Sequence, residues 1–518
     1  MTSKLQNQSS AEVKNRTGEQ SDAVNFFSSV TESFKRIKRL RSIVGVQPGN
    51  YKMGSDRKLN LMQYYLETQF LPEFAQDISG YCLEFQADCY ASRFGKESIT
   101  KLDIVQFNEG HLQATKISDL TQQLNQLPSN TFDCIICTYV LHAIFDLKQT
   151  VSELHRILKP DGVLLVAAPH VSIRDYEHEF WRFTPEGLQL LLEKDFGTES
   201  TTIRFYGNSL TAVGVVRGLL AEEFTDSELN YHDLRFAPVV CARAIKQTAT
   251  KSSTVATADQ NSTTSPDFSN KKSLKELLGT LVKPSIYSQL KNVYRFYRRL
   301  SLQLGAPIAR LRLVVGLEPL SYILGYDRGP DLMRYHLENE FLPQFAGDIR
   351  GHCLEFEENR YASWFDGKGV IKIDVLHVDQ SNPRATLIAD LTKPNNLPSN
   401  TFDCIICTYV LHVIFDVEKA IAELHRILKP GGVLLVAVPQ VSIRDYEHEI
   451  WRFTPEALQL LLGREFGSES VTVRAYGNSL IAAAAIRGLV VDEFADSELV
   501  YSDPRFASVV CARAVKPS

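Results

Sequence analysis

The stretch LPSNTFDCIICTYVLHAIFD at residues 127–146 recurs at 397–416 with a single substitution, Ala143 in the first copy and Val413 in the second. Such near-identity over twenty residues indicates a duplicated segment. The distance from residue 127 to residue 397 is a period of 270 residues, whereas solenoid repeats are roughly 20 to 50 residues long. The chain therefore contains one complete domain twice.

The repeat also predicts the domain boundaries. A second run, VSIRDYEHEFWRFTPE, recurs with one substitution at 171–186 and 441–456. Between the copies lies a segment of Thr, Ser, Ala and Lys with little to bury, which is typical of a flexible linker. The sequence predicts a disordered N-terminus over 1–22, the first copy over 23–247, a linker over 248–273 and the second copy over 274–516.

Composition limits the class of protein. The 518 residues are 44% hydrophobic and 23% charged, as in ordinary folded domains. A net charge of −5 offers no general attraction to nucleic acid, so we expect no nucleic-acid partner. The chain begins without the apolar core of a secretory signal and has no run of 18 apolar residues. We expect a cytoplasmic protein.

Within each copy, short apolar runs alternate with longer helical patterns. In the first copy strands are expected at YCLEFQ, ITKLDIV, FDCIICTYV, GVLLVAAP and VVCARAI. The amphipathic pattern from Leu147 to Leu158 predicts a helix that ends before Pro160. This alternation predicts a doubly wound, Rossmann-like α/β fold, with a mostly parallel sheet covered by helices on both faces.

The nine cysteines predict no metal site. The two CxxC pairs, Cys134/Cys137 and Cys404/Cys407, lie inside strand-like runs. Side chains three apart on a strand point to opposite faces, so neither pair can share a metal. We expect reduced thiols in the core.

Acidic residues follow the predicted strands, at the edge where a doubly wound sheet binds ligands. A carboxylate after the second strand can accept hydrogen bonds from both ribose hydroxyls, and a later one can bond an adenine amino group. The candidates are Glu84 and Glu355 after the first strand, Asp103 and Asp374 at the end of the second, and Asp119 and Asp390 ahead of a leucine.

This motif series resembles the class I S-adenosylmethionine-dependent methyltransferases of the methyltransferase type 11 family, over nearly all of both copies. The run LHRILKPGGVLLVAVP at 424–439 is similar to the family's fifth-strand motif. The resemblance implies seven-stranded sheets, S-adenosylmethionine as cofactor and methyl transfer. It adds four cofactor-binding candidates, which are Gln86, Tyr139, Glu357 and Tyr409.

The acceptor is suggested by a wider resemblance. The pattern that ends in WRFTPE is similar to methyltransferases of polysaccharide biosynthesis. That likeness implies a small-molecule or glycan-linked acceptor methylated on a hydroxyl or carboxyl.

One departure from the family leaves two readings open. The family has glycines after the first strand, because a residue without a side chain lets the backbone approach the cofactor. Here the turns read EFQAD at 84–88 and EFEEN at 355–359, without glycine. Either at least one copy is an enzyme, or the pair is a non-catalytic scaffold or acceptor-binding module.

The run HVSIRDYEHEFWRF after the fifth strand is dense in polar and aromatic residues, which suits a hydroxylated acceptor. His178 and His448 are the candidate general bases, because histidine titrates near neutral pH. The alternative is a surface loop closed by salt bridges. His142, after the fourth strand, is expected to cap or pack a helix start.

Basic and apolar residues share helical segments ahead of each core, at 26–41 and 291–299. Such a helix either buries its apolar side on the domain or docks on an anionic membrane surface or a phosphate-bearing acceptor. We also expect the two copies to pair within the chain.

Overall fold

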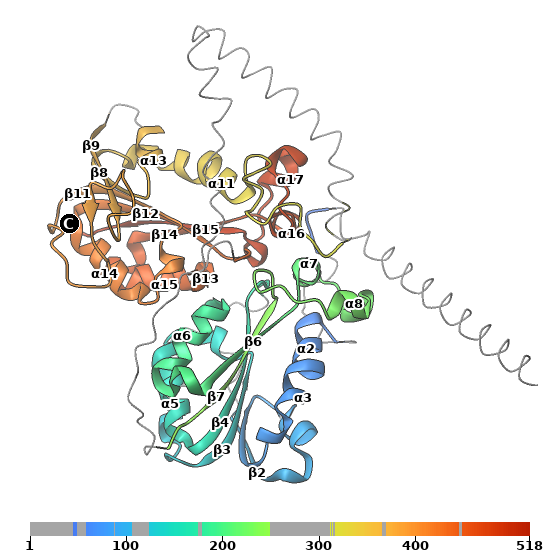
Figure 1. Cartoon of the computed structure of the whole chain (residues 1–518). Helices are drawn as coiled ribbons and strands as arrows, with labels where there is room; N and C mark the ends of the chain where they lie inside the picture. The colour runs from blue at the N-terminus through green and yellow to red at the C-terminus, as the bar shows by residue number, and fades with distance from the viewer. Residues whose placement is uncertain are drawn as a thin grey trace, which may run out of the picture.

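The computed structural model describes residues 45–48, 59–87, 89–105, 124–174, 179–248, 311, 313, 316–364, 369–444 and 448–518. The predicted N-terminal segment 1–22, linker residues 249–273 and the basic segments 26–41 and 291–299 lie outside the described residues. The two copies form the blue-to-green and yellow-to-red halves of Figure 1.

The first copy is built on a sheet in the order β2-β1-β3-β4-β7-β6. Its neighbours are parallel except at β7, which runs antiparallel to β4 and β6. The strands are β1 Gly80–Phe85, β2 Ile99–Val105, β3 Phe132–Thr138, β4 Leu158–Pro169, β6 Thr201–Tyr206 and β7 Val239–Ile245.

The second copy repeats this sheet in the order β10-β9-β8-β11-β12-β15-β14. The residues that match its edge strand β10 fall in segment 106–123 of the first copy, outside the described part of the chain. The strands are β8 Gly351–Phe356, β9 Val370–His377, β10 Leu387–Ile388, β11 Phe402–Thr408, β12 Leu428–Pro439, β14 Val471–Tyr476 and β15 Val509–Val515.

Helices cover both faces of each sheet, as Figure 1 shows for α5 and α6 on one face and α2 and α3 on the other. The first copy has α2 Leu61–Tyr65, α3 Leu71–Glu73, α5 Leu147–Ile157, α6 Pro185–Phe196, α7 Ser209–Arg217 and α8 Asp226–Leu229. The second has α11 Leu332–His336, α12 Leu342–Gln344, α13 Arg360–Trp364, α14 Val417–Ile427, α15 Pro455–Phe466, α16 Ser479–Ile486 and α17 Asp496–Val500. The predicted doubly wound fold is confirmed.

Short 3-10 and π turns complete these layers. In the first copy they are η2 Leu66–Phe70, η3 Ala75–Asp77, η4 Ala91–Gly95, η5 Lys96–Ser98, η8 Leu141–Ala143, η9 Thr198–Ser200 and η10 Ala221–Glu223. In the second they are η11 Leu337–Phe341, η12 Ala346–Asp348, η13 Leu411–Val413, η14 Ser468–Ser470, η15 Val491–Glu493 and η16 Pro504–Phe506.

The sequence pattern explains the best-defined elements. Helix α5 buries Leu147, Val151, Leu154 and Ile157, which recur at helical spacing, and it ends one residue before the predicted Leu158. Strand β3 is buried along nearly its whole length because helices cover both faces of the sheet.

A two-stranded sheet joins the copies. Strand β5, Trp181–Phe183, pairs antiparallel with β13, Trp451–Phe453, so that the same three residues of each copy face one another. The Thr184 hydroxyl donates to the Glu449 carbonyl at 2.6 Å, and the Thr454 hydroxyl donates to the Glu179 carbonyl at 2.5 Å. This reciprocity is the pattern of an isologous two-fold interface.

Buried ion pairs flank this sheet. The side chains of Arg182 and Arg452 are fully buried, and each contacts a glutamate three residues before it, Glu179 or Glu449. Burial alone would raise the pKa of each carboxyl, but the arginine beside it lowers the pKa of both glutamates to about 2. The charged network at the junction is therefore ionised at neutral pH.

A second contact joins α7 to α16. The Arg217 guanidinium donates to the Ser479 hydroxyl at 2.8 Å, and the Arg487 guanidinium donates to the Ser209 hydroxyl. Both arginines are buried, so this contact repeats the two-fold pattern of the strand pair.

Gly187 offers a test of the junction. A Cβ at Gly187 would lie 2.3 Å from the carbonyl oxygen of Ile450 in the other copy. We expect Gly187→Ala to lower the free energy of unfolding by about 1–3 kcal/mol, because α6 must move away from β13. Urea unfolding measures the change. The matched control is Ala457→Gly in α15, where a methyl is removed and the loss should be near 1 kcal/mol; an equally stable Gly187→Ala variant would contradict the described contact.

His170, which follows β4, gives stability a pH dependence. Burial, together with the positive charges of Arg452 and Arg444 of the other copy, lowers the pKa of His170 to about 3. The folded protein therefore binds fewer protons than the unfolded chain between pH 3 and 6.5, and stability falls as pH decreases through 6.5.

The second copy has Gln440 at this position, so His170→Gln should remove the dependence. When the pH is lowered from 8 to 5, the free energy of unfolding of the variant should rise by about 2 kcal/mol relative to that of the wild type. Urea unfolding at each pH measures this difference. Gln440→His should introduce the same dependence in the second copy. A wild-type-to-variant difference that is equal at both pH values would refute the assignment.

Candidate functional site

A cavity of about 490 Å³ lies at the carboxyl ends of the parallel strands of the second copy. Its walls come from the segments that follow β8, β9 and β11 and from the chain after β10. The lining residues are Phe356, Glu357, Leu376, His377, Val378, Ala389, Asp390, Leu391, Thr392, Tyr409, Val410, Val413, Ile414, Phe415, Asp416 and Ile450. This is the edge at which a doubly wound sheet binds ligands.

Glu355, near the end of β8, shapes the turn beside this cavity. Glu355 is buried and accepts hydrogen bonds from the backbone N–H groups of Tyr361 and Ala362 at 2.9 and 2.7 Å. Burial raises the pKa of Glu355. Glu84 does the same in the first copy with the N–H groups of residues 89–91. Both carboxylates therefore fix the loop rather than point into the open cavity.

The residues at the expected glycine positions keep a glycine-like backbone. Gln86 has φ +70° and Glu357 has φ +63°, in the left-handed region that L side chains rarely adopt. The Glu357 side chain is 71% exposed and its carboxylate lies 3.2 Å from His377 Nε2. The turn thus follows the path that a glycine would take, with its side chain at the rim of the cavity.

Asp103 and Asp374 do not end their strands, and that prediction is wrong. Strand β2 continues to Val105 and β9 to His377, so both aspartates pair with the middle of the first strand, at Leu83 and Leu354. Asp103 accepts a hydrogen bond from the Tyr81 hydroxyl.

Asp374 is similarly engaged inside the sheet. His352 Nε2 lies 2.7 Å from its carboxylate, and the Thr386 hydroxyl donates to it at 2.9 Å. Lys101 and Lys372 of the same strands also pair with Asp103 and Asp374, so both carboxylates are engaged within the sheet.

Two residues that the sequence analysis missed lie at this edge, His377 as the last residue of β9 and Asp379 two residues later. His377 Nδ1 lies 3.2 Å from the Asp379 carboxylate, which is 63% exposed, and His377 Nε2 faces Glu357. A sequence signal existed: the apolar run continues past Asp374 through Val375 and Leu376, so the strand had to end later.

Asp390 lies on the cavity wall, as the predicted Asp-Leu motif requires. The hydroxyl and backbone N–H of Thr392 lower the pKa of Asp390 to about 2, so its carboxylate is ionised. The matching Asp119 lies outside the described residues.

Tyr139 and Tyr409 begin the segments after β3 and β11 with positive φ of 54° and 56°. Tyr409 lines the cavity, and burial raises the pKa of both hydroxyls. Each N–H donates to the adjoining strand, at Ala167 or Ala437, at 2.8 Å. The aromatic residue thus redirects the chain where it leaves the sheet.

Of the two candidate general bases, only His448 is among the described residues. His178 lies outside the described residues, while His448 is exposed and two residues from Ile450 on the cavity wall. His142 and His412 are buried, and His412 Nε2 lies 3.2 Å from the Glu449 carboxylate. These last two support the junction between the copies.

Charged residues of the same loop bridge the copies instead of forming a free acceptor site. Arg174 pairs with Glu456, and Arg444 pairs with Glu186 at 2.6 Å. Together with buried Arg182, these ion pairs favour the alternative of a loop closed by salt bridges for its charged residues.

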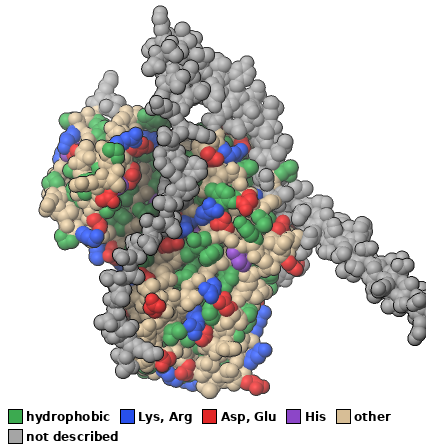
Figure 2. Space-filling model, in the orientation of Figure 1, with side chains coloured by type: hydrophobic (Ala, Val, Ile, Leu, Met, Phe, Trp, Pro, Cys, Tyr) green, Lys and Arg blue, Asp and Glu red, His purple; other side chains and the backbone are tan. Residues whose placement is uncertain are grey.

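Metal-binding groups and membrane-spanning helices are absent from the part of the chain that the structure describes. No group of three His, Cys, Asp or Glu side chains there is arranged to hold a metal ion. In the same ranges, every helix is too short or too polar to cross a bilayer. On the face that Figure 2 shows, Lys and Arg are interspersed with Asp and Glu over the coloured residues.

Comparison with known proteins gives two matches to one family. The family described as "Methyltransferase domain" matches residues 78–166 and 367–436. Ubiquinone/menaquinone biosynthesis C-methyltransferase from Teredinibacter turnerae is 41% identical over 59 residues, 11% of this chain and 24% of that protein. The enzyme of the same name from Pasteurella multocida is 34% identical over 83 residues, 16% of this chain and 31% of that protein. The chain spans less than a third of the length of these relatives.

Solved structures align at low similarity. Phosphoethanolamine N-methyltransferase 2 from Haemonchus contortus, in complex with S-adenosyl-L-methionine, is 11% identical, and the alignment covers 88% of this chain and 99% of that one with a TM-score of 0.26. A possible histamine N-methyltransferase from Thermotoga maritima is 17% identical, with 35% and 93% covered and a TM-score of 0.25.

The positive φ at Glu357 predicts an effect on stability. Glu357→Gly and Glu357→Ala both remove the carboxylate, but only alanine keeps a Cβ in the left-handed region. We expect the glycine variant to be more stable than the alanine variant by about 1 kcal/mol, measured by urea unfolding. Glycine that is equal to or worse than alanine would show that this turn does not hold a positive φ.

Proposed function

We propose that this protein is an S-adenosylmethionine-dependent methyltransferase, because residues 78–166 and 367–436 match the family described as "Methyltransferase domain". The observation that carries the proposal is the cavity of the second copy, which lies at the ligand-binding edge of the sheet and is lined by residues of the family's motif positions. Bound S-adenosylmethionine supplies an electrophilic methyl carbon on a sulfonium.

The residues around the cavity suit this cofactor. The exposed Asp379 would accept hydrogen bonds from the ribose hydroxyls, and Asp390 would accept one from the adenine amino group. The backbone of Glu357, turned by its positive φ, would approach the methionine part. Carboxylates at this rim also favour a cationic ligand.

The second copy is our choice for the cofactor-binding unit. Strand register aligns Phe85–Val105 with Phe356–Leu376, so Gln106 and Asn108 correspond in the sequence to His377 and Asp379. The first copy thus lacks the carboxylate that would hold the ribose.

For the acceptor we propose a hydroxyl or carboxyl of a small molecule or a glycan-linked group. The density of polar and aromatic residues in the sequence over 171–186 and its repeat favours this class, with Arg174, Arg182 and Arg444 excepted because the junction engages them. The imidazole of His448 would take the acceptor's proton, since it is exposed near the cavity wall. His178 would do so if the first copy were active.

A second candidate is a non-catalytic scaffold. The missing glycines in both copies and the extensive buried contacts between the copies favour it. The two candidates differ in whether cofactor binds.

Calorimetric titration of S-adenosylhomocysteine into the whole protein tests the proposal. We expect saturable binding that weakens about 10- to 100-fold in Asp379→Asn, because one charged hydrogen-bond acceptor is worth about 1.5–3 kcal/mol. The matched control is Asn108→Ala in the first copy, which should bind like the wild type. Absence of binding at millimolar ligand would favour the scaffold, and unchanged binding by Asp379→Asn would remove Asp379 from the site.

A further inference from the structure

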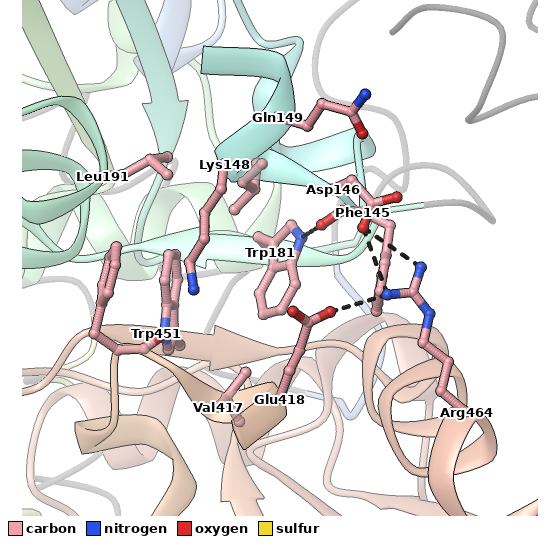
Figure 3. Close-up of a pocket in the computed structure, with 12 residues that line it drawn as sticks. Phe145, Asp146, Lys148, Gln149, Trp181, Leu191, Val417, Glu418, Trp451 and Arg464 are labelled. Carbon is pink, nitrogen blue, oxygen red and sulfur yellow. Dashed lines mark hydrogen bonds and ion pairs between the residues drawn. The ribbon is translucent and has the colours of Figure 1, made fainter. Parts of the chain in front are cut away.

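A second cavity, of about 310 Å³, lies between the two copies. Phe145, Lys148 and Trp181 line it from the first copy, and Phe415, Trp451 and others from the second. Figure 3 shows these side chains converging from both halves of the chain, with Lys148 extending between the two tryptophans. Neither copy alone can form this cavity.

The cavity adjoins the cofactor site of the second copy. Phe415 lines both spaces, and its ring stacks on Trp451 with centroids 5.7 Å apart. Asp416 lines the larger cavity and pairs with Lys148 of the first copy. A molecule in the smaller cavity would therefore lie one side chain away from the cofactor.

The walls of the cavity are aromatic. Trp181 and Trp451 have ring centroids 5.2 Å apart. Their indole N–H groups donate to the carbonyls of Phe145 and Phe415 at 3.3 and 3.4 Å, so the indoles offer apolar surface to a ligand. Aromatic surface of this kind accommodates the apolar face of a ring.

The charged residues of the lining balance. Two acids, Asp146 and Glu418, face two bases, Lys148 and Arg464. Arg464 pairs with Glu418 at 2.9 Å and with Asp146 at 3.4 Å (Figure 3). A lining of no net charge with both donors and acceptors suits a neutral ligand that carries several hydroxyls.

The two copies agree at the aromatic positions and differ in charge at the position of Lys148. Phe145 and Trp181 recur as Phe415 and Trp451, whereas Lys148 at the start of α5 is replaced by Glu418 at the start of α14. The cavity therefore has an aromatic frame with two-fold symmetry and a polar lining without it. Such asymmetry gives a ligand one preferred orientation.

We propose that this cavity binds the acceptor, a neutral hydroxylated ring of the sugar class, and that Lys148 of the first copy holds it against the cofactor site of the second. The role of this ligand as methyl acceptor rests on the proposed function. The binding of the ligand in the cavity does not. Lys148 acts here as a specificity-determining residue, through hydrogen bonds from its ammonium group to ring hydroxyls.

Tryptophan fluorescence reports on the cavity directly. The chain has three tryptophans, and the third, Trp364, is 60% exposed in α13. In the full-length Trp364→Phe protein the remaining two both line the cavity. The probes are the methyl glycosides of glucose, galactose, mannose and rhamnose. We expect at least one to change the emission saturably, and Lys148→Ala in the same background to weaken that binding more than tenfold.

Lys419→Ala is the matched control. Lys419 also pairs with Asp416, at 2.9 Å, but it does not line the cavity. This variant removes a cation from the same aspartate and should bind the glycoside like the parent. Equal weakening by the two variants would show an indirect effect through Asp416 and overturn the role of Lys148.

The remaining outcomes separate this proposal from the proposed function. Calorimetry with S-adenosylhomocysteine should give the same affinity in Lys148→Ala as in the parent, while Asp379→Asn should keep the glycoside response. Glycoside binding without cofactor binding would sink the methyltransferase proposal alone. Cofactor binding with no response to any glycoside, or a saturable response only to tetramethylammonium or to benzoate, would overturn the sugar-class cavity.

Discussion

Two arginine side chains, Arg182 and Arg452, are fully buried where the copies meet, and the rest of the molecule is arranged around them. Each contacts a buried glutamate and the backbone carbonyls of its own copy. Removing one partner from such a pair leaves an uncompensated charge, which typically costs about 3–5 kcal/mol. Pairing of the two three-residue strands keeps both ion pairs buried, so loss of Glu179 or Glu449 would destabilise the junction.

The junction also reaches the larger cavity of the second copy. Ile450 lines the cavity, while its carbonyl accepts a hydrogen bond from Thr184 of the first copy at 3.2 Å. Its N–H donates to the carbonyl of His412, in the segment after β11 that begins at Tyr409, at 2.9 Å. One wall of the cavity is thus held by the other copy, and the shape of the site depends on the pairing.

The fold was predictable where local pattern decides it. Helix α5 and strand β3 follow directly from apolar spacing, because burial of those residues is their main source of stability. The roles of Asp103 and Asp374 were not predictable, since Tyr81, His352 and Thr386 reach them from other strands.

Other parts of the site depend equally on distant contacts. The run WRF looked like part of an acceptor loop, but it is a strand whose partner is the same run 270 residues away. The left-handed backbone at Glu357 was also not predictable, because glutamate rarely adopts a positive φ.

The two-fold junction has a further consequence because both halves are encoded by one chain. In a dimer of identical subunits, every substitution at the interface appears twice, and a residue that suits one side must suit the other. In this chain the two sides of the interface can differ. Gly187, which faces Ile450, is equivalent to Ala457 in the second copy, and His170 is equivalent to Gln440. Fusion of the copies thus frees the interface from symmetry, so that one half can specialise while the other retains the shared frame.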